Sequence, residues 1–197
     1  MIINKFSDIY FAEFIKILKK ISLKDIDLLI EKIFEIKNKN GRIFFLGVGG
    51  SAANCSHAVN DFRKICEIES YTPTDNVSEL TARINDDGWN NSFSSWLKIS
   101  KLKSIDGIFI LSVGGGSEEK KISLNLIEAI KYGKKQNAKI FGIIGPNGGY
   151  TFDHGDNVVK LPDIKNNFIT PISESLQSVI WHSIVSDPRL KVNETKW

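Results

Sequence analysis

Two short apolar segments, each followed by a run of Gly and Ser, constrain the fold of this 197-residue chain more than any other feature. In RIFFLGVGGSAA (residues 42–53) a hydrophobic run stops at glycines and continues into a helical pattern. IDGIFILSVGGGSEEKK (105–121) repeats the arrangement, and its helix is expected to follow the turn directly and to end near Gln136. Two further apolar strands are predicted within residues 138–149 and 157–163. Apolar strands that alternate with helices indicate a central parallel sheet covered by helices on both faces, a three-layer α/β/α sandwich.

Two amphipathic segments precede the first strand and predict an N-terminal pair of helices. Hydrophobic residues recur at helical spacing from Phe6 to Leu18. The second segment opens with Ser22 and, three residues later, Asp25, a variant of the capping box that marks helix starts. A helix pair cannot bury both of its apolar stripes by itself, so we expect residues 1–40 to pack on the sheet or on a partner subunit.

Length and composition favour a single domain spanning residues 1–197. The net charge is only +3 and the lysines are spread along the chain, so we expect no nucleic-acid partner. No apolar run approaches the roughly 20 residues that a membrane span needs, and the first residues do not have the pattern of a signal peptide. Cys55 and Cys66, expected within one helix and too far apart to pair, suit a reducing compartment as small buried side chains. We therefore expect a cytoplasmic protein with no membrane partner.

Both Gly/Ser turns have the features of an anion site. A turn that leaves a parallel strand and opens a helix presents free backbone N–H groups and the positive end of the helix dipole. Ligands of open α/β sheets bind beyond the carboxyl ends of the strands, where both turns must lie. Ser117 also fits the N-cap of the following helix, and the two roles are compatible. The predicted phosphate-binding residues are Gly49, Gly50, Ser51, Ser112, Gly114, Gly115 and Ser117.

The first turn by itself also fits a dinucleotide-binding fingerprint. Gly47, Gly49 and Ala52 have the required spacing, and Glu67 or Glu69 lies near the distance expected for a ribose contact. A dinucleotide fold has no need for a second hydroxyl-bearing anion loop on a later strand, so we expect no nucleotide cofactor. Tight turns with a purely structural role are the remaining alternative.

Several segments together carry a resemblance to a known family: the N-terminal helices, GVGGSAANCSHAVNDF, NDDGWNNSF, LSVGGGS, IIGPNGG and ESLQSVIWH. They resemble SIS (sugar isomerase) domains and, within that superfamily, phosphoheptose (sedoheptulose 7-phosphate) isomerases. The resemblance covers nearly the whole chain and implies a flavodoxin-like fold. It implies an enzyme that interconverts sedoheptulose 7-phosphate and an aldoheptose 7-phosphate through an enediol, for bacterial surface heptose in lipopolysaccharide or capsule. Such enzymes are homotetramers with active sites at subunit interfaces, often with zinc bound there.

The resemblance assigns roles to individual residues of this chain. Ser51, Ser112 and Ser117 match the phosphate-binding serines of the family. His57 matches a histidine on the first core helix. Asp61 falls where the family has a catalytic glutamate that can also touch the metal.

Further matches lie in the middle and at the end of the chain. Asn85 and Asp86 match a substrate-proximal loop, although a helix-capping role is an equally good interpretation. Gln177 matches the glutamine of the last helix. Counting from this glutamine, the catalytic histidine of the family would fall at Val185, and the nearest candidate is His182, one helical turn earlier.

Ketose–aldose isomerisation needs a base over one face of the substrate, an acid at the carbonyl oxygen and an anchored phosphate. His57 and Asp61 are four residues apart and share a helix face, a spacing that suits two ligands of one metal. We expect Asp61 to be the base and His182 the acid, with His57, Asp61 and Gln177 as candidate zinc ligands. The alternatives are a hydrogen-bonded, half-buried His57, a lysine partner for Asp61, and a core or interface position for His182.

Departures from the family pattern leave rival functions open. Val48 replaces a substrate-facing amide, and Val113 lies in a loop with fewer hydroxyl donors than the family has. Asp61 retracts the expected carboxylate by roughly 1.5 Å, and a displacement of about 1 Å can cost on the order of 100-fold in rate. The chain is therefore expected to be a slow isomerase, an isomerase of another sugar phosphate, or a non-catalytic SIS module that binds a phosphosugar as a sensor or regulator.

Overall fold

The computed structural model describes residues 5–194, and its centre is a five-stranded sheet. The strands lie in the order β2-β1-β3-β4-β5, and all four pairings are parallel. This order places the carboxyl ends of β1 and β3, and therefore the starts of both Gly/Ser turns, on neighbouring strands. The strands are β1 (Ile43–Leu46), β2 (Ser70–Tyr71), β3 (Gly107–Ser112), β4 (Lys139–Ile144) and β5 (Asn157–Lys160).

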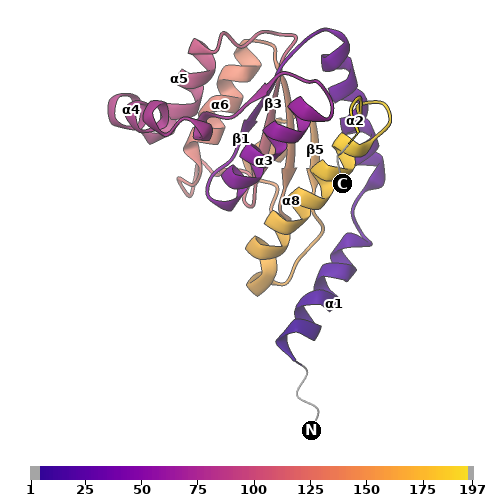
Figure 1. The fold of residues 1–197 in the computed structure, drawn as a ribbon. Coiled ribbons are helices and arrows are strands. Elements are labelled where there is room, and N and C mark those ends of the chain that lie inside the picture. Colours follow the sequence, from indigo (N-terminus) through magenta and orange to yellow (C-terminus); the bar gives the residue numbers. More distant parts are fainter. Residues whose placement is uncertain (1–4, 195–197) are drawn as a thin grey trace.

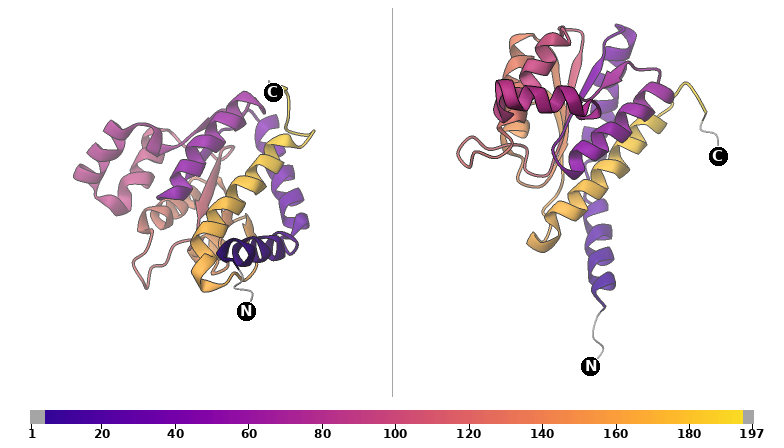
Figure 2. Two further views of the ribbon diagram at one scale, coloured as in Figure 1. Left: turned by 60° about the horizontal axis from the view of Figure 1, so that its bottom comes forward. Right: turned by 60° about the vertical axis from the view of Figure 1, so that its left-hand side comes forward.

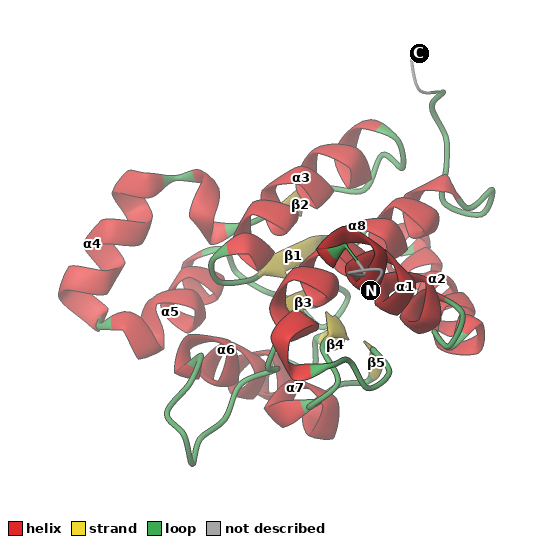
Figure 3. Cartoon of the chain, turned by 90° about the horizontal axis from the view of Figure 1, so that it is seen from below, coloured by secondary structure: helices red, strands yellow, loops and turns green. Residues whose placement is uncertain are grey.

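Helices cover both faces of the sheet, so the predicted three-layer sandwich is confirmed (Figure 3). Within the described part of the chain, no helix combines the length and the apolarity that crossing a membrane requires. The α-helices are α1 (Phe6–Leu18), α2 (Leu23–Asn38), α3 (Gly50–Lys64), α4 (Val77–Asp87), α5 (Ser92–Ile99), α6 (Leu124–Lys135), α7 (Gly149–His154) and α8 (Ile169–Ser186). Short 3₁₀ segments lie at η1 (Pro73–Asp75), η2 (Trp89–Asn91) and η3 (Asn166–Phe168).

The two faces of the sheet belong to two separate hydrophobic clusters. Phe109 and Leu111 of β3 pack with α2, α3 and α8, whereas Ile108 and Ile110 pack with α5 and α6. Successive side chains of a strand point to opposite faces, so a strand covered on both sides is apolar at every position. This explains why the strands are continuous hydrophobic runs in the sequence.

The N-terminal helix pair forms, and its two helices pack differently. Ser22 caps α2, because its Oγ accepts a hydrogen bond of 3.3 Å from the backbone N–H of Asp25. α2 buries an apolar stripe against the sheet, whereas α1 extends away from the body of the domain (Figure 1). Phe6 and Phe11 of α1 are 71% and 61% exposed. α2 therefore packs on the sheet, whereas α1 leaves much of its apolar surface exposed.

The segment after β3 differs from the prediction. α6 begins at Leu124 and not directly after the Gly/Ser turn. Residues 117–122 intervene as a small hairpin, in which Ser117 and Ile122 exchange two backbone hydrogen bonds of 3.0 Å. The N-cap position of α6 is held by Ser123, so the interpretation of Ser117 as that cap is wrong.

The cause of this difference is the backbone of the glycine run. Gly115 and Gly116 adopt φ values of 68° and 88°, which redirect the chain before a helix can start. The carbonyl of Gly148, in the turn after β4, lies where a side chain at Gly115 would be. The hydroxyl of Thr151 donates a hydrogen bond of 2.7 Å to the Gly115 carbonyl and fixes the two turns together.

Asn85 and Asp86, which the sequence matched to a substrate-proximal loop, belong to a helix that packs on α5 and η2. Asn85 and Asp86 lie in the last turn of α4 and are exposed. The N-cap of this helix is Asn76, whose Oδ1 accepts a hydrogen bond of 3.2 Å from the N–H of Glu79. The capping interpretation of Asn85 and Asp86 is therefore wrong, and their match to a substrate-proximal loop remains a prediction.

Both cysteines are free and buried, as predicted, although only Cys55 lies within α3 and Cys66 follows the end of that helix. Burial raises the pKa of the Cys66 thiol to about 11 and raises the pKa of Cys55 still further. Both thiols therefore stay protonated at neutral pH and act as apolar packing groups.

Asp106, directly before β3, ties the start of this strand to the start of β1. Its buried carboxylate accepts hydrogen bonds from the Arg42 backbone N–H (2.9 Å), the Arg42 guanidinium (2.7 Å) and the Lys103 backbone N–H (2.9 Å). We expect Asp106→Ala to lower the free energy of unfolding by about 3–5 kcal/mol, because it leaves a partly buried cation and two N–H groups without an acceptor. Urea denaturation measures this loss. Exposed Asp27→Ala is the control, and an equal loss in both variants would contradict the assignment.

Candidate active site

The candidate site lies along the contact between α3 and α8, which run side by side in both views of Figure 2. Gly50 contacts Glu174 at one end of this contact, and His57 contacts Trp181 further along. The residue number rises in the same direction on both helices, so the two helices are parallel. Each turn of α3 therefore faces a corresponding turn of α8.

Asn54 is the polar side chain that joins the two helices. Its Nδ2 donates to the backbone carbonyl of Glu174 (2.9 Å) and to Oε1 of Gln177 (3.0 Å). Its Oδ1 accepts a hydrogen bond of 3.0 Å from the hydroxyl of Ser178. Three hydrogen bonds to two turns of α8 fix the register of the helices, and this register determines which side chains meet one turn further along.

One to two turns beyond Asn54, the helices bring together His57, Asp61 and His182. Their ligand atoms all lie within 4.8 Å of one another. Oδ2 of Asp61 is 3.7 Å from Nε2 of each histidine, and the two imidazole centroids are 5.2 Å apart. The carboxylate is 13% exposed, whereas the side chains of His57 and His182 are 55% and 47% exposed. Three of the residues predicted from the sequence thus meet, with the carboxylate at the centre and the rings open to solvent.

These three residues line a cavity of about 480 Å³. Val185, the position where a histidine was expected by counting from Gln177, lies in the wall of the same cavity. His182 reaches Asp61 from one turn earlier, so the histidine that the counting missed is supplied by the neighbouring turn of α8.

The donor set fits a divalent metal. Two imidazole nitrogens and one carboxylate oxygen are a set that zinc uses in catalytic sites, with a fourth position left for water or substrate. Nδ1 of His182 lies 2.7 Å from the backbone carbonyl of Ser178. A hydrogen bond donated there leaves Nε2 free toward Asp61, in the way that outer contacts orient metal-binding histidines.

Gln177, the third predicted zinc ligand, takes part in the helix contact. Its side chain is fully buried, and its Oε1 accepts the hydrogen bond from Asn54. Its role as a metal ligand remains a prediction.

The first Gly/Ser turn carries a negative charge beside it. Gly49 has a φ of 65° and open space around it, Gly50 begins α3, and the Ser51 side chain is buried. The carboxylate of Glu174 lies directly against Gly50. The positive end of α3 is thus faced by a carboxylate of the same chain, which is a favourable placement for that charge but opposes a second anion.

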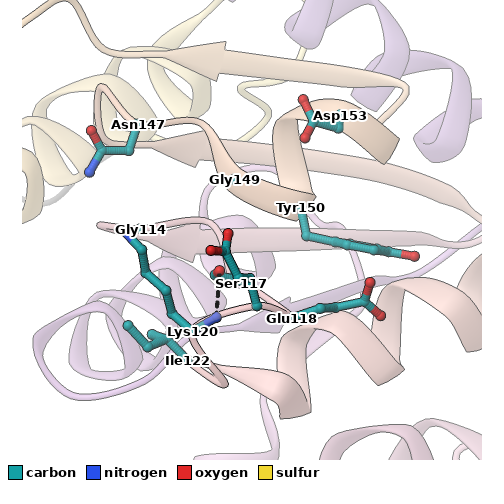
Figure 4. Close-up of a pocket in the computed structure, with 11 residues that line it drawn as sticks. Gly114, Ser117, Glu118, Lys120, Ile122, Asn147, Gly149, Tyr150 and Asp153 are labelled. Atoms are coloured by element: carbon teal, nitrogen blue, oxygen red, sulfur yellow. Dashed lines mark hydrogen bonds between the residues drawn. The ribbon is translucent and has the colours of Figure 1, made fainter.

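The second turn borders a cavity of about 530 Å³ that contains no residue of the first turn (Figure 4). The hydroxyls of Ser112 and Ser117 accept hydrogen bonds from the backbone N–H groups of Gly115 (3.0 Å) and Lys120 (3.2 Å). Both hydroxyls keep their own protons for another acceptor. The two turns therefore lie at separate cavities in the chain as described.

The second cavity has a mixed charge. Its lining includes Lys120 and three acidic residues, one of which, Glu118, forms an ion pair of 2.9 Å with Lys131. Burial raises the pKa of the Tyr150 phenol, so this group in the lining remains a donor at neutral pH. The acidic residues of the lining are Glu118, Glu119 and Asp153.

Sequence reasoning missed three residues of the α3–α8 contact. Asn54 lies three residues before His57 on the same helix face. An amide on this face could have indicated a hydrogen-bonded contact with another helix. Glu174 lies eight residues before His182, a spacing that also keeps two side chains on one face. Trp181 has no sequence signal for its contacts with the histidines.

Comparison with known proteins shows what this chain and its fold are similar to. No protein-family model matches the chain. It is 29% identical over 195 residues to phosphoheptose isomerase 2 of Campylobacter jejuni, covering 92% of this chain and 90% of that protein. It is 26% identical over 162 residues to the lincomycin biosynthesis protein LmbN of Streptomyces lincolnensis, covering 77% of this chain but only 57% of the relative.

Solved structures agree with these sequence relatives. The phosphoheptose isomerase of Neisseria gonorrhoeae superimposes with a TM-score of 0.80 at 22% identity, covering 91% of this chain and 95% of that one. The fold is thus that of SIS-type sugar isomerases. The resemblance to phosphoheptose isomerases stated from the sequence is confirmed.

Asn54→Ala is expected to lower the free energy of unfolding by about 2–3 kcal/mol, because it removes three hydrogen bonds and leaves the buried Gln177 amide without its partner. Urea denaturation measures the change. Asn90→Ala, at an exposed position on η2, is the matched control and should stay within about 0.5 kcal/mol of the parent protein. A loss below 1 kcal/mol in Asn54→Ala would mean that the helix contact does not depend on this side chain.

Glu174→Gln is expected to tighten the binding of inorganic phosphate at the first turn about tenfold. Two like charges about 4 Å apart repel by about 1–4 kcal/mol in surroundings between water and a protein surface. Titration followed by ³¹P NMR gives the dissociation constants. Ser175→Ala is the control. Ser175 lines a shallow pocket together with Gly50 and Glu174, so the substitution keeps the negative charge and should leave the affinity unchanged. Equal affinity in Glu174→Gln and the parent protein would show that the carboxylate does not oppose an anion.

Proposed function

We propose that this protein is a phosphosugar isomerase that interconverts sedoheptulose 7-phosphate and an aldoheptose 7-phosphate through an enediol. The observation that carries the proposal is the cluster of Asp61 between His57 and His182 in an open cavity. The reaction needs a base and an acid that reach adjacent carbons of the substrate. This cluster supplies both, since Oδ2 of Asp61 lies 3.7 Å from Nε2 of His182. The relatives named phosphoheptose isomerase support the same substrate class.

In this proposal Asp61 is the base. Its carboxylate removes the proton from C1 of the ketose, and the same group returns a proton to C2 of the enediol. The two flanking imidazoles limit the directions in which this carboxylate can turn, because each Nε2 faces the same Oδ2. A fixed carboxylate can serve both carbons in turn without reorientation.

His182 is the acid. As an imidazolium it donates the Nε2 proton to the carbonyl oxygen at C2 as the proton leaves C1, and it takes a proton from the oxygen at C1 when the aldehyde forms. The Ser178 carbonyl holds the Nδ1–H throughout, so the ring returns to a defined tautomer after each transfer.

A divalent metal, proposed to be zinc, would be held by His57, Asp61 and His182 in place of this proton transfer, because a metal on Nε2 of His182 leaves that nitrogen without a proton to donate. When bound, it would polarise the substrate oxygens as a Lewis acid. The chain's own contribution is the orientation of the three donors, which the Asn54 contact one turn away maintains.

For the substrate phosphate we propose the second turn, with Ser112, Gly114, Gly115 and Ser117. Free serine protons and the Tyr150 phenol are available there as donors, and Lys131 offsets the Glu118 charge. Gly49, Gly50 and Ser51 are then left to contact hydroxyls of the polyol chain, because a carboxylate accepts hydrogen bonds from hydroxyls and repels a phosphate. Asn85 and Asp86 are proposed to approach the substrate only in an assembled oligomer.

We propose further that residues 1–197 form one domain and assemble as a cytoplasmic homotetramer with active sites at subunit interfaces, in the synthesis of surface heptose. The exposed apolar side chains of α1 support assembly. A helix that extends from its domain with many exposed hydrophobic side chains is typical of a subunit contact. These side chains include Phe6, Phe11 and Ile15.

A second candidate function is a non-catalytic phosphosugar-binding module of the same fold. It is favoured by Glu174 against the first turn and by Val48 and Val113, which leave both turns with fewer donors than an isomerase of this type has. An isomerase of a different sugar phosphate fits the same observations.

The test is turnover. Purified protein is incubated with sedoheptulose 7-phosphate, with and without added zinc, and the aldoheptose phosphate is followed by NMR. We expect slow turnover that falls at least about 100-fold in Asp61→Asn, because this variant keeps the shape and loses the base.

Ser56→Ala, one residue before His57 and bonded to Asp75, is the matched control and should keep turnover. Saturable protection against heat by the sugar phosphate without turnover would move the protein to the binding-module class or to another substrate. Neither turnover nor protection would contradict a phosphosugar site altogether.

A further inference from the structure

Trp181 occupies the space beneath both histidines of the cluster. Its indole is stacked on the His182 ring, with centroids 3.6 Å apart and planes inclined by 26°. The His57 ring meets the same indole edge-on, with centroids 4.7 Å apart and planes inclined by 74°. The two imidazoles that face Asp61, one from α3 and one from α8, thus both contact the buried indole of Trp181.

The contact with Trp181 matters because few other contacts fix the orientation of the two imidazoles. Their side chains are 55% and 47% exposed, and an exposed side chain samples several rotamers. His57 has its 3.7 Å contact with Asp61, and His182 has that contact and its Nδ1 contact to Ser178. Each aromatic contact favours one ring orientation over the others.

The indole is not the side chain that packing alone favours. Trp181 is fully buried, and its Nε1–H has no hydrogen-bond partner among the described residues. A buried donor without a partner destabilises the folded state, and Phe or Leu at this position would avoid that cost. A role for the flat ring surface explains why a costly side chain lies here.

We propose that Trp181 is a positioning residue that holds the imidazoles of His57 and His182 in the orientation needed to bind a divalent cation together with Asp61. The inference rests on the metal-binding part of the proposed function, and it concerns the geometry of the donors and not turnover. Without the indole, the imidazoles of His57 and His182 can rotate. The affinity for the cation and the geometry of its coordination should therefore change together.

The experiment is a titration of the full-length protein with Co²⁺ alone, because this ion gives a visible absorption spectrum that depends on the geometry of its ligands. Binding is also followed by quenching of tryptophan fluorescence, which Trp181 beside the site should dominate. We expect Trp181→Leu to weaken Co²⁺ binding at least tenfold and to change the visible spectrum. Trp181→Phe, which keeps a flat ring, should stay within about threefold and keep the spectrum, but lose most of the quenching.

Trp96→Phe is the matched control, because Trp96 is buried in the cluster on the opposite face of the sheet. It should leave the Co²⁺ affinity and the quenching unchanged. Trp181→Met replaces Trp181→Leu if the latter fails to fold, since Met fills irregular space without a ring. Urea denaturation of each variant separates loss of stability from loss of binding.

If Trp181→Leu or Trp181→Met binds Co²⁺ with the same affinity and the same visible spectrum as the parent protein, the proposal is overturned and Trp181 is a core residue. A parent protein that does not bind Co²⁺ would overturn it too, even if the protein isomerises the sugar phosphate. A parent protein that binds Co²⁺ with the expected dependence on Trp181 but has no turnover would leave this inference standing and contradict the isomerase.

Discussion

Three hydrogen bonds from Asn54 join α3 to α8, and the candidate site depends on this contact. The helices are parallel, so a register set at Asn54 is carried along both axes to the next turn. There it decides that His182 and Trp181 face His57 and Asp61. A slip of one residue would turn each side chain by about 100° around its helix and separate the carboxylate from at least one imidazole.

Charge is distributed unevenly over the two turns that the sequence marks as anion sites. Glu174 lies against the first turn, so the N-terminus of α3 already has a negative partner. The second turn has three acidic residues near it; Lys131 pairs with Glu118, and Lys120 adds one positive charge to the lining. A ligand with one anionic end and several hydroxyls suits such a site better than a ligand that carries charge at both ends.

The sequence predicted the sheet, the helix layers and the shared face of His57 and Asp61, because periodicity and i,i+4 spacing are local properties. His182 was named as their partner only through the resemblance to a known family, since no local pattern joins residues 61 and 182. It failed after β3, where the strong Gly/Ser signal suggested an immediate helix. Gly115 instead packs against Gly148 of the next turn, a contact between distant segments that no local pattern contains. It also did not predict that Oε1 of Gln177 accepts a hydrogen bond from Asn54, because residue type and helix membership do not show which way an amide points.

The sequence by itself determined that the strands are buried on both faces, that Ser22 starts α2 and that His57 and Asp61 share one helix face. These features follow from side-chain period and capping within a few residues. Only the tertiary structure decided that Glu174 faces the first turn, that Gln177 is withdrawn into the helix contact and that Trp181 supports both histidines. Each of these depends on the rotation of α8 about its axis relative to α3. That rotation is set by hydrogen bonds between residues more than a hundred positions apart.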